Sequence, residues 1–179
     1  AYSRFTAGNP MNHAISSSLL GLKTAYYAVV GDDSAGKEIR DALKKNKVAL
    51  KYLQKDKKNA TNISAVISFK GERTILVYHV AREYRLPANV KAKWFYLTSA
   101  GPQNALSPLH KQVLQALKKN PSMKMAFNPG THQMHLGMKS LAPLFLHTEV
   151  LFMNKEEYER VLGMEGRNIK QLLIAMHDL

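Results

Sequence analysis

The chain has 179 residues, of which 26 are Lys or Arg, 13 are Asp or Glu and none is Cys. The absence of cysteine excludes a disulfide framework and a thiolate metal site. No apolar run approaches the ~20 residues of a membrane-spanning helix, and residues 1–9 lack the features of a secretory signal. We therefore expect one globular domain without a membrane segment, located in the cytoplasm.

The formal charge of +13 permits attraction to polyanions such as nucleic acids. Many of the basic residues are lysines that gather in one stretch: Lys44, Lys45, Lys47, Lys51, Lys55, Lys57 and Lys58. Lysine runs of this kind are usually solvated surface. No aromatic residues are interleaved with the 55–58 run, as a platform for base stacking would require. Nucleic-acid binding is therefore the minority interpretation.

The first part of the chain predicts a helix, a strand and a second helix. Asn9, which is followed by proline, is a favourable N-cap for the first helix. A strand over residues 24–30 comes next and leads into a turn. Asp33 or Ser34 caps the second helix, whose apolar residues recur at every fourth position and whose basic residues gather at its C-terminal end.

Residues 48–86 change in character and predict an antiparallel insertion. Strands are expected at residues 48–53, 63–69 and 74–78, with a hairpin turn at residues 70–73. Serines alternate with apolar residues in the middle strand, so one face of the hairpin is available to solvent or a ligand. We interpret this insertion as a small lid; a simple extension of the sheet edge is the alternative.

After residue 87 the alternation of strands and helices resumes. Strands are expected at residues 94–98, 123–127 and 149–153, and a loop follows the first of these at residues 99–102. Helices are expected to start near Ser107, His135, Asn154 and Asn168. The apolar run at residues 150–153 is typical of a strand buried on both faces. Repeated strand–helix units predict an α/β fold, a mostly parallel sheet flanked by helices.

Three asparagine-containing clusters fall at strand ends or helix starts: Gly8–Asn12, Asn128–Thr131 and Asn154–Glu157. Each has a local explanation as a cap or a turn, and Asn154–Glu157 by itself fits a capping box. Ligands of α/β proteins bind beyond the carboxyl ends of the strands, so the recurrence of asparagine there favours a ligand site.

Other common sites are not supported by the sequence. It contains no Gly-x-Ser-x-Gly elbow, no P-loop and no Gly-x-Gly-x-x-Gly after its first strand. His132 and His135 lack a third ligand at metal-binding spacing, and we expect them at the surface or in turns.

The order of the motifs resembles the ribokinase-like (PfkB) family of carbohydrate kinases. Ala7–Asn12 corresponds to the Gly-Gly-Asn-x-x-Asn substrate motif of that family, and Val29–Gly36 to its strand–turn–helix. Gly71–Thr74 is similar to the hairpin of the lid. Asn128–Thr131 and Asn154–Glu157 match in both sequence and order, so the resemblance covers essentially the whole chain.

The resemblance implies an enzyme that transfers a phosphoryl group from ATP, with Mg²⁺, to a hydroxyl of a sugar or nucleoside-like molecule. Gly8, Asn9 and Asn12 would then bind the substrate. The amide of Asn128 would lie near the phosphate path. The residues of the metal and phosphate site would be Asn154 and Glu157. The lid within residues 48–86 would cover the sugar, and a homodimer would form through it.

Two parts of the family pattern are missing from the sequence. The Gly-Ala-Gly-Asp motif, whose aspartate is the catalytic base, does not occur, and no strand precedes the Gly-Asn motif. Ala7 also replaces the first glycine of that motif. We therefore expect residues 1–179 to be part of one kinase domain that is inactive alone. The alternative is a catalytically silent member of the fold in a basic, nucleic-acid-associated assembly.

Overall fold

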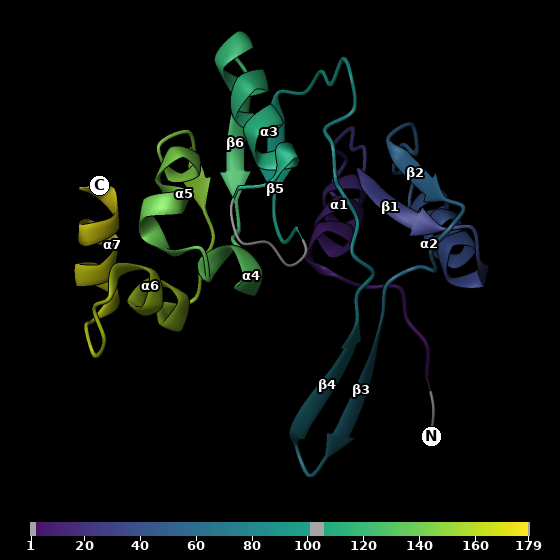
Figure 1. The fold of residues 1–179 in the computed structure, drawn as a ribbon, viewed down its shortest axis with the longest axis horizontal. Helices are drawn as coiled ribbons and strands as arrows, with labels where there is room; N and C mark the ends of the chain where they lie inside the picture. Colours follow the sequence, from purple (N-terminus) through teal and green to yellow (C-terminus); the bar gives the residue numbers. More distant parts are fainter. Residues whose placement is uncertain (1–2, 101–105, 179) are drawn as a thin grey trace. The chain divides into compact units, whose positions relative to one another are not determined.

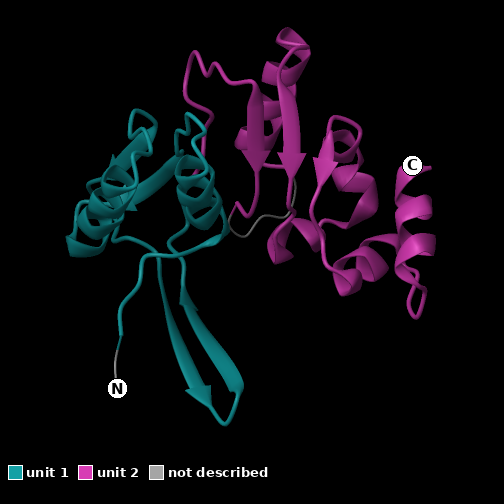
Figure 2. Ribbon diagram, turned by 180° about the vertical axis from the view of Figure 1, so that it is seen from behind, with its two compact units in different colours: residues 1–82 teal, residues 83–179 magenta. Residues whose placement is uncertain are grey.

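The computed structural model describes residues 3–100 and 106–178 and divides into two compact units, residues 1–82 and 83–179 (Figures 1 and 2). Each unit contains a parallel sheet, and the first also carries an antiparallel hairpin. The predicted α/β class with a small antiparallel element is therefore confirmed. No helix of the described residues combines the length and the apolar character needed to cross a bilayer.

Unit 1 is built from α1 (Asn9–Leu19), β1 (Ala28–Gly31), α2 (Ser34–Lys45) and β2 (Leu53–Asp56). The two strands pair in parallel, from Ala28 opposite Leu53 to Gly31 opposite Asp56. Apolar residues of both helices and of the strands form one core: Met11, Ala14, Val30, Leu43, Val48 and Leu53. This core holds the start of α1, which carries the predicted substrate residues, against the sheet.

Two of the predictions for unit 1 were wrong in detail. The N-cap of α1 is Gly8 rather than Asn9, because the chain enters the helix through a φ of 117° that glycine tolerates best. The strand predicted at residues 48–53 does not form, because the Leu53 N–H donates to the Leu50 C=O in a turn, and β2 begins at Leu53. Val48 lies in the core without belonging to a strand.

The junction of β1 and α2 is closely packed. Asp33 caps α2, as predicted, by accepting a 2.8 Å hydrogen bond from the Gly36 N–H. A Cβ atom at Gly36 would lie 2.2 Å from the backbone oxygen of Gly31, a separation at which something must shift. Glycine at position 36 therefore allows the helix to start directly above the end of β1.

The hairpin consists of β3 (Ile63–Phe69) and β4 (Glu72–Tyr78), paired antiparallel from Ile63 opposite Tyr78 to Phe69 opposite Glu72. Lys70 and Gly71 form the turn with φ angles of 50° and 86°, as a two-residue hairpin loop requires. The predicted hairpin is confirmed. Every residue of both strands is exposed, and Figure 1 shows the hairpin projecting away from the helices of unit 1.

Unit 2 contains a three-stranded parallel sheet in the order β5 (Trp94–Leu97), β6 (Lys124–Phe127) and β7 (Val150–Leu151). Its helices are α3 (Pro108–Lys119), α4 (Thr131–Met134), α5 (Gly137–Phe145), α6 (Lys155–Leu162) and α7 (Ile169–His177). Fully buried side chains from the central strand and the helices form its core: Val113, Met125, Phe127, Leu141, Leu144 and Leu172.

The predicted burial of residues 150–153 was wrong. Val150 is 37% exposed and Phe152 is 49% exposed. Among the described strands β7 pairs only with β6, and over two residues, so it is an edge strand with a free side. The predicted helix near residues 135–141 is in fact the pair α4 and α5. Residues 101–102 of the predicted loop 99–102 lie outside the described residues.

Candidate functional site

The carboxyl edge of the sheet in unit 2 brings two of the three predicted clusters close together. Asn128 directly follows β6, and its Nδ2 donates a 2.7 Å hydrogen bond to the Phe152 C=O, just beyond β7. The Thr98 hydroxyl, just beyond β5, donates to Asn128 Oδ1 at 3.4 Å. The amide side chain of Asn128 therefore links the ends of three neighbouring strands. Its contact at β7, Phe152, lies two residues before Asn154.

Asn154 and Glu157 form a reciprocal capping box at the start of α6. The Glu157 N–H donates to Asn154 Oδ1, and the Asn154 N–H donates to Glu157 Oε2, both at 2.8 Å. The cap expected from the sequence is thus present. It fixes both side chains at the helix N-terminus, where the helix dipole favours negative charge.

The capping box uses only one carboxylate oxygen of Glu157. Among the described residues, Oε1 has no hydrogen-bond or ion-pair partner, and the residue is only partly buried. The described residues contain no group of three or more His, Asp or Glu residues placed to hold a metal ion. Any metal here would therefore rely on this one carboxylate, on water and on a ligand.

The turn after β6 packs tightly on the turn after β5. A Cβ atom at Gly130 would lie 2.4 Å from Ser99 Oγ. The Gly130 N–H donates to Gln133 Oε1 at 2.7 Å, and Gln133 Nε2 donates to the Thr98 C=O at 3.2 Å. These contacts fix the orientation of the buried Gln133 amide and the turn that follows Asn128.

His110 completes this buried network. Its Nε2 lies 3.1 Å from Gln133 Nε2, and its Nδ1 lies 2.9 Å from Ser107 Oγ. The Gln133 NH₂ group can only donate to His110 Nε2, and the Ser107 N–H donates to His110 Nδ1 at 3.2 Å, so donors face both ring nitrogens. Burial lowers the pKa of His110 from 6.5 to about 4, so the ring is neutral at neutral pH.

The third cluster lies in unit 1, at the exposed start of α1. The Asn12 N–H donates to the Gly8 C=O at 2.9 Å, and this bond forms the first turn of the helix. Gly8, Asn9 and Asn12 are all exposed. Asn9 is the first residue of α1, directly after the N-cap Gly8, and Asn12 lies about one turn further along the helix.

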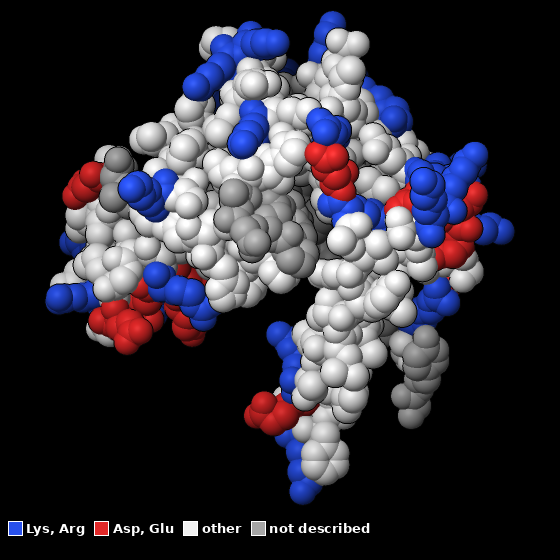
Figure 3. Space-filling model, in the orientation of Figure 1, with Lys and Arg blue, Asp and Glu red and all other residues white. Residues whose placement is uncertain are grey.

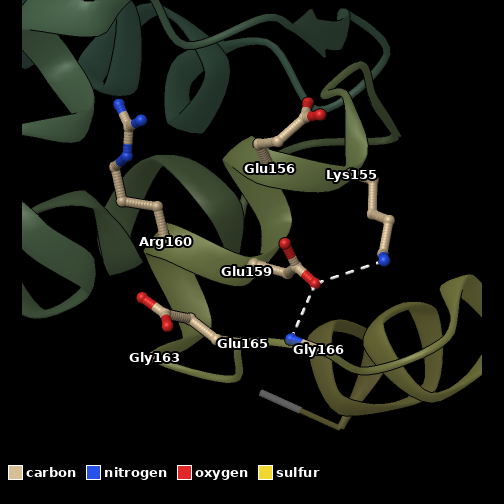
Figure 4. Close-up of a pocket in the computed structure, with 7 residues that line it drawn as sticks. All are labelled: Lys155, Glu156, Glu159, Arg160, Gly163, Glu165 and Gly166. Carbon is tan, nitrogen blue, oxygen red and sulfur yellow. Dashed lines mark hydrogen bonds and ion pairs between the residues drawn. The ribbon is translucent and has the colours of Figure 1, made fainter.

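A separate hollow lies beside α6 and the loop that follows it (Figure 4). It is lined by charged side chains and glycines of α6 and of the loop that follows: Lys155, Glu156, Glu159, Arg160, Gly163, Glu165 and Gly166. Glu159 accepts bonds from Lys155 Nζ at 3.4 Å and from the Gly166 N–H at 3.0 Å. None of the predicted site residues lines this hollow, so we do not assign it to the site.

Comparison with known proteins identifies the family. The family model described as "pfkB family carbohydrate kinase" matches residues 1–179. The chain belongs to the PfkB family of carbohydrate kinases. The resemblance inferred from the order of the motifs is thereby confirmed.

Individual PfkB relatives differ in their substrates. The chain is 33% identical over 137 residues to a 5-dehydro-2-deoxygluconokinase of Bacillus licheniformis, covering 70% of this chain and 42% of the relative. It is similar in fold to a fructokinase of Vibrio cholerae O395 solved with fructose, ADP and calcium, with a TM-score of 0.72, 21% identity and 96% and 59% coverage. A Methanocaldococcus jannaschii nucleoside kinase gives a TM-score of 0.71, 21% identity and 92% and 54% coverage. The chain therefore spans about half the length of these relatives.

The buried histidine predicts a pH-dependent stability. The unfolded chain binds a proton at His110 below pH 6.5, whereas the folded protein does so only near pH 4. Burial of His110 therefore leaves the free energy of unfolding unaffected well above pH 6.5 and lowers it as the pH falls toward 4. The free energy of unfolding, measured with urea, should fall between pH 7.0 and pH 4.5. This fall should be about 2 to 3 kcal/mol larger in the unsubstituted protein than in His110→Gln.

His177→Gln is the matched control, because His177 is exposed on α7. Because His177 takes no part in the buried network, the loss of stability at low pH that the burial of His110 causes should remain in this variant. An equal pH dependence in the unsubstituted protein and in His110→Gln would contradict the assignment of a neutral, buried His110.

Proposed function

We propose that the chain is part of an ATP-dependent kinase that phosphorylates a hydroxyl of a sugar or a related small molecule. Membership of the PfkB family supports this proposal. The observation that carries it is the arrangement of Asn128, Asn154 and Glu157 at one edge of the unit 2 sheet. In α/β proteins this edge is where ligands bind.

Glu157 and Asn154 are proposed to hold Mg²⁺ through water. Mg²⁺ prefers oxygen ligands, keeps several of its waters and is usually bound by one or two carboxylates together with substrate phosphates. The second carboxylate oxygen of the partly buried Glu157, Oε1, fits that donor set. When bound, the ion would neutralise charge on the transferring phosphoryl group. The capping box keeps the carboxylate in place before any ligand arrives.

Asn128 is proposed to lie beside the phosphate path, although both groups of its amide already have protein partners. Its role would therefore be to fix the ends of the strands around the phosphate. Gly8, Asn9 and Asn12 are proposed to bind the substrate. Amide side chains both donate and accept hydrogen bonds, as sugar hydroxyls require, and Gly8 leaves room for close approach.

The catalytic base is proposed to come from outside the sequence shown here. The Gly-Ala-Gly-Asp motif does not occur in residues 1–179. We therefore propose that this chain is catalytically inactive alone and that its two units belong to one kinase domain. A cytoplasmic location is proposed with it, since ATP is the phosphoryl donor.

A phosphorylation assay tests the proposal directly. The full-length gene product should transfer phosphate from [γ-³²P]ATP to a ketose, a sugar acid or a nucleoside, and the transfer should depend on Mg²⁺. The chain of residues 1–179 alone should give no turnover above background, because no base activates the acceptor hydroxyl.

Robust turnover by residues 1–179 alone would overturn the proposal that the base is supplied from elsewhere. An inactive full-length protein that binds DNA or RNA with a steep loss of affinity in added salt would support the alternative, a silent nucleic-acid-associated subunit. Part of the basic surface is paired with acidic side chains, which argues against that alternative. Figure 3 shows Lys and Arg interspersed with Asp and Glu near α2 and β2, and Lys55 is paired with Asp32.

The metal role of Glu157 can be separated from its capping role. Glu157→Gln keeps a side-chain oxygen for the Asn154 N–H but removes the charge. In the full-length enzyme we expect kcat/KM to fall on the order of 100-fold and the Mg²⁺ concentration for half-maximal rate to rise. The unfolding free energy should change by less than about 1 kcal/mol.

Glu156→Gln is the control for this substitution, because Glu156 also lies in the first turn of α6 but takes no part in the capping box. It should cost a similar amount of stability and leave the Mg²⁺ dependence unchanged. Equal losses of activity in both variants would assign the effect to the helix dipole instead of to a metal-binding carboxylate.

The hairpin is proposed to act as the lid over the sugar and to contact a second copy of the chain. The strand register places large apolar side chains on one of its faces: Ile63, Ile67, Phe69, Leu76 and Tyr78. Each of these is more than half exposed, and Figure 3 shows an uncharged hairpin surface with charged side chains along one edge and at the tip. The opposite face is mixed: it carries Val66, Ile75 and Val77 together with Ser64 and Ser68, whose hydroxyls can hydrogen-bond to a polar substrate.

A charge on the apolar face should therefore weaken dimerisation. Leu76→Lys is expected to raise the dimer dissociation constant by at least about 10-fold, because a charged group would be buried in the interface. Ser64→Lys, on the opposite face of the same hairpin, should have little effect. Sedimentation equilibrium measures both, and a monomeric unsubstituted protein would contradict the dimer proposal.

A further inference from the structure

The base of the hairpin contains a nearly buried arginine that the proposed mechanism does not use. Arg82 follows β4, and its side chain is only 3% exposed, although the hairpin above it is open to solvent. Its partner Asp56 is the last residue of β2 and is 16% exposed. A charged pair this deep at the foot of an exposed element indicates a specific structural task.

Arg82 contacts several parts of the connection from β2 into β3. Its Nε donates to Asp56 Oδ2 at 3.0 Å, and its Nη1 donates to Asn62 Oδ1 at 2.8 Å. Its Nη2 donates to the Asn59 C=O at 3.3 Å and also to the Ala60 C=O. The guanidinium thus holds the residues that lead into the first lid strand.

The partners of Arg82 are themselves held in place. Asp56 accepts from the Lys58 N–H at 2.8 Å and from Asn59 Nδ2 at 2.9 Å. The Asn59 side chain, the Lys58 N–H and Arg82 together hold the pKa of Asp56 well below its usual value, so the carboxylate stays charged. Asn62 Oδ1 also accepts from the Val80 N–H at 3.0 Å, which links the two strands of the lid at their base.

A second contact ties the same connection to α2. The Thr61 N–H and hydroxyl donate to the two oxygens of Asp33 at 2.8 and 2.7 Å. The Gly31 N–H donates to Thr61 Oγ1 at 2.9 Å. The end of β1, the start of α2 and the entry into the lid therefore share one set of hydrogen bonds.

We propose that Arg82 is a positioning residue that fixes the direction of the hairpin relative to α1, which carries the proposed substrate residues. We call Asp56, Asn59, Asn62 and Arg82 the hinge clamp. The inference rests on the proposed function, since it makes the hinge clamp responsible for where the lid meets the sugar. Lysine cannot replace Arg82, because a single ammonium group cannot satisfy the carboxylate, the amide and two carbonyls in one plane.

The position of the lid can be measured directly, because the chain has no cysteine of its own. Ser16→Cys on α1 and Ser68→Cys on β3 give one pair of spin labels on exposed residues of the same unit. Double electron–electron resonance should give a narrow distribution of the distance between the two spin labels in this background. Adding Arg82→Lys should roughly double its width.

Arg85→Lys is the matched control. Arg85 lies three residues further along, and its ion pair with Glu83 is exposed, at 61% and 55% of the two side chains. This variant should keep the narrow distribution. A distribution as narrow in Arg82→Lys as in the background, or equally broad in both arginine variants, would overturn the inference.

Kinetics of the full-length enzyme provide the second readout. A misdirected lid removes binding that the substrate and the transition state share, so in Arg82→Lys the KM for the sugar should rise about 10-fold. The values of kcat and of the KM for ATP should stay within about twofold. A general structural defect would instead lower the melting temperature and reduce kcat, and that result would also overturn the inference.

The two tests separate this inference from the proposed function. A full-length protein that phosphorylates no sugar or nucleoside would overturn the proposed function. The spin-label distances would then still decide whether Arg82 directs the hairpin. A kinase in which Arg82→Lys changes neither the distances nor the sugar KM would keep its function and lose this positioning residue.

Discussion

Some backbone groups at the carboxyl ends of the parallel strands are not paired with a neighbouring strand, and amide and hydroxyl side chains satisfy them. In unit 1 the Gly31 N–H donates to Thr61, which in turn is held by Asp33. In unit 2 Gln133 bonds to the Thr98 C=O and Asn128 to the Phe152 C=O. Buried polar groups are costly when unpaired, so these contacts fix the turns that leave the sheets. The proposed phosphate edge is built from groups that the fold already requires.

This constraint explains how a cap and a ligand site can share the same residues. A helix N-terminus needs acceptors for its free N–H groups, and Glu157 supplies one oxygen to the Asn154 N–H. A carboxylate has a second oxygen, and capping holds it at a fixed position near the ends of β6 and β7. Preorganisation of this kind matters in phosphoryl transfer, where most of the catalysis is positioning and electrostatic stabilisation. The structural role of Glu157 thus supports the proposed metal role.

Local patterns predicted much of the fold, and the contacts between distant residues were not predictable. The hairpin at residues 63–78 and the caps at Asp33, Asn154 and Asn168 follow from turn and capping preferences within a few residues. Burial of His110 depends on Gln133, 23 residues further along the chain, and no pattern in the sequence signals that contact. The same holds for Arg82 and Asp56, which are 26 residues apart. The edge position of β7 was missed because an apolar run does not reveal how many neighbours a strand has.

The exposed hairpin raises a question of stability that the hinge clamp answers in part. A two-stranded hairpin in water is marginal on its own, and β3 and β4 bury no residue in the described structure. Asn62 and Arg82 fix both strands at one end, which reduces the conformational entropy lost when the ladder forms. The turn end of the hairpin has no such contacts. A partner that binds the apolar face would therefore stabilise the paired form of β3 and β4 by mass action. Substrate binding and dimerisation would therefore be coupled through the same strands, each lowering the cost of ordering the lid for the other.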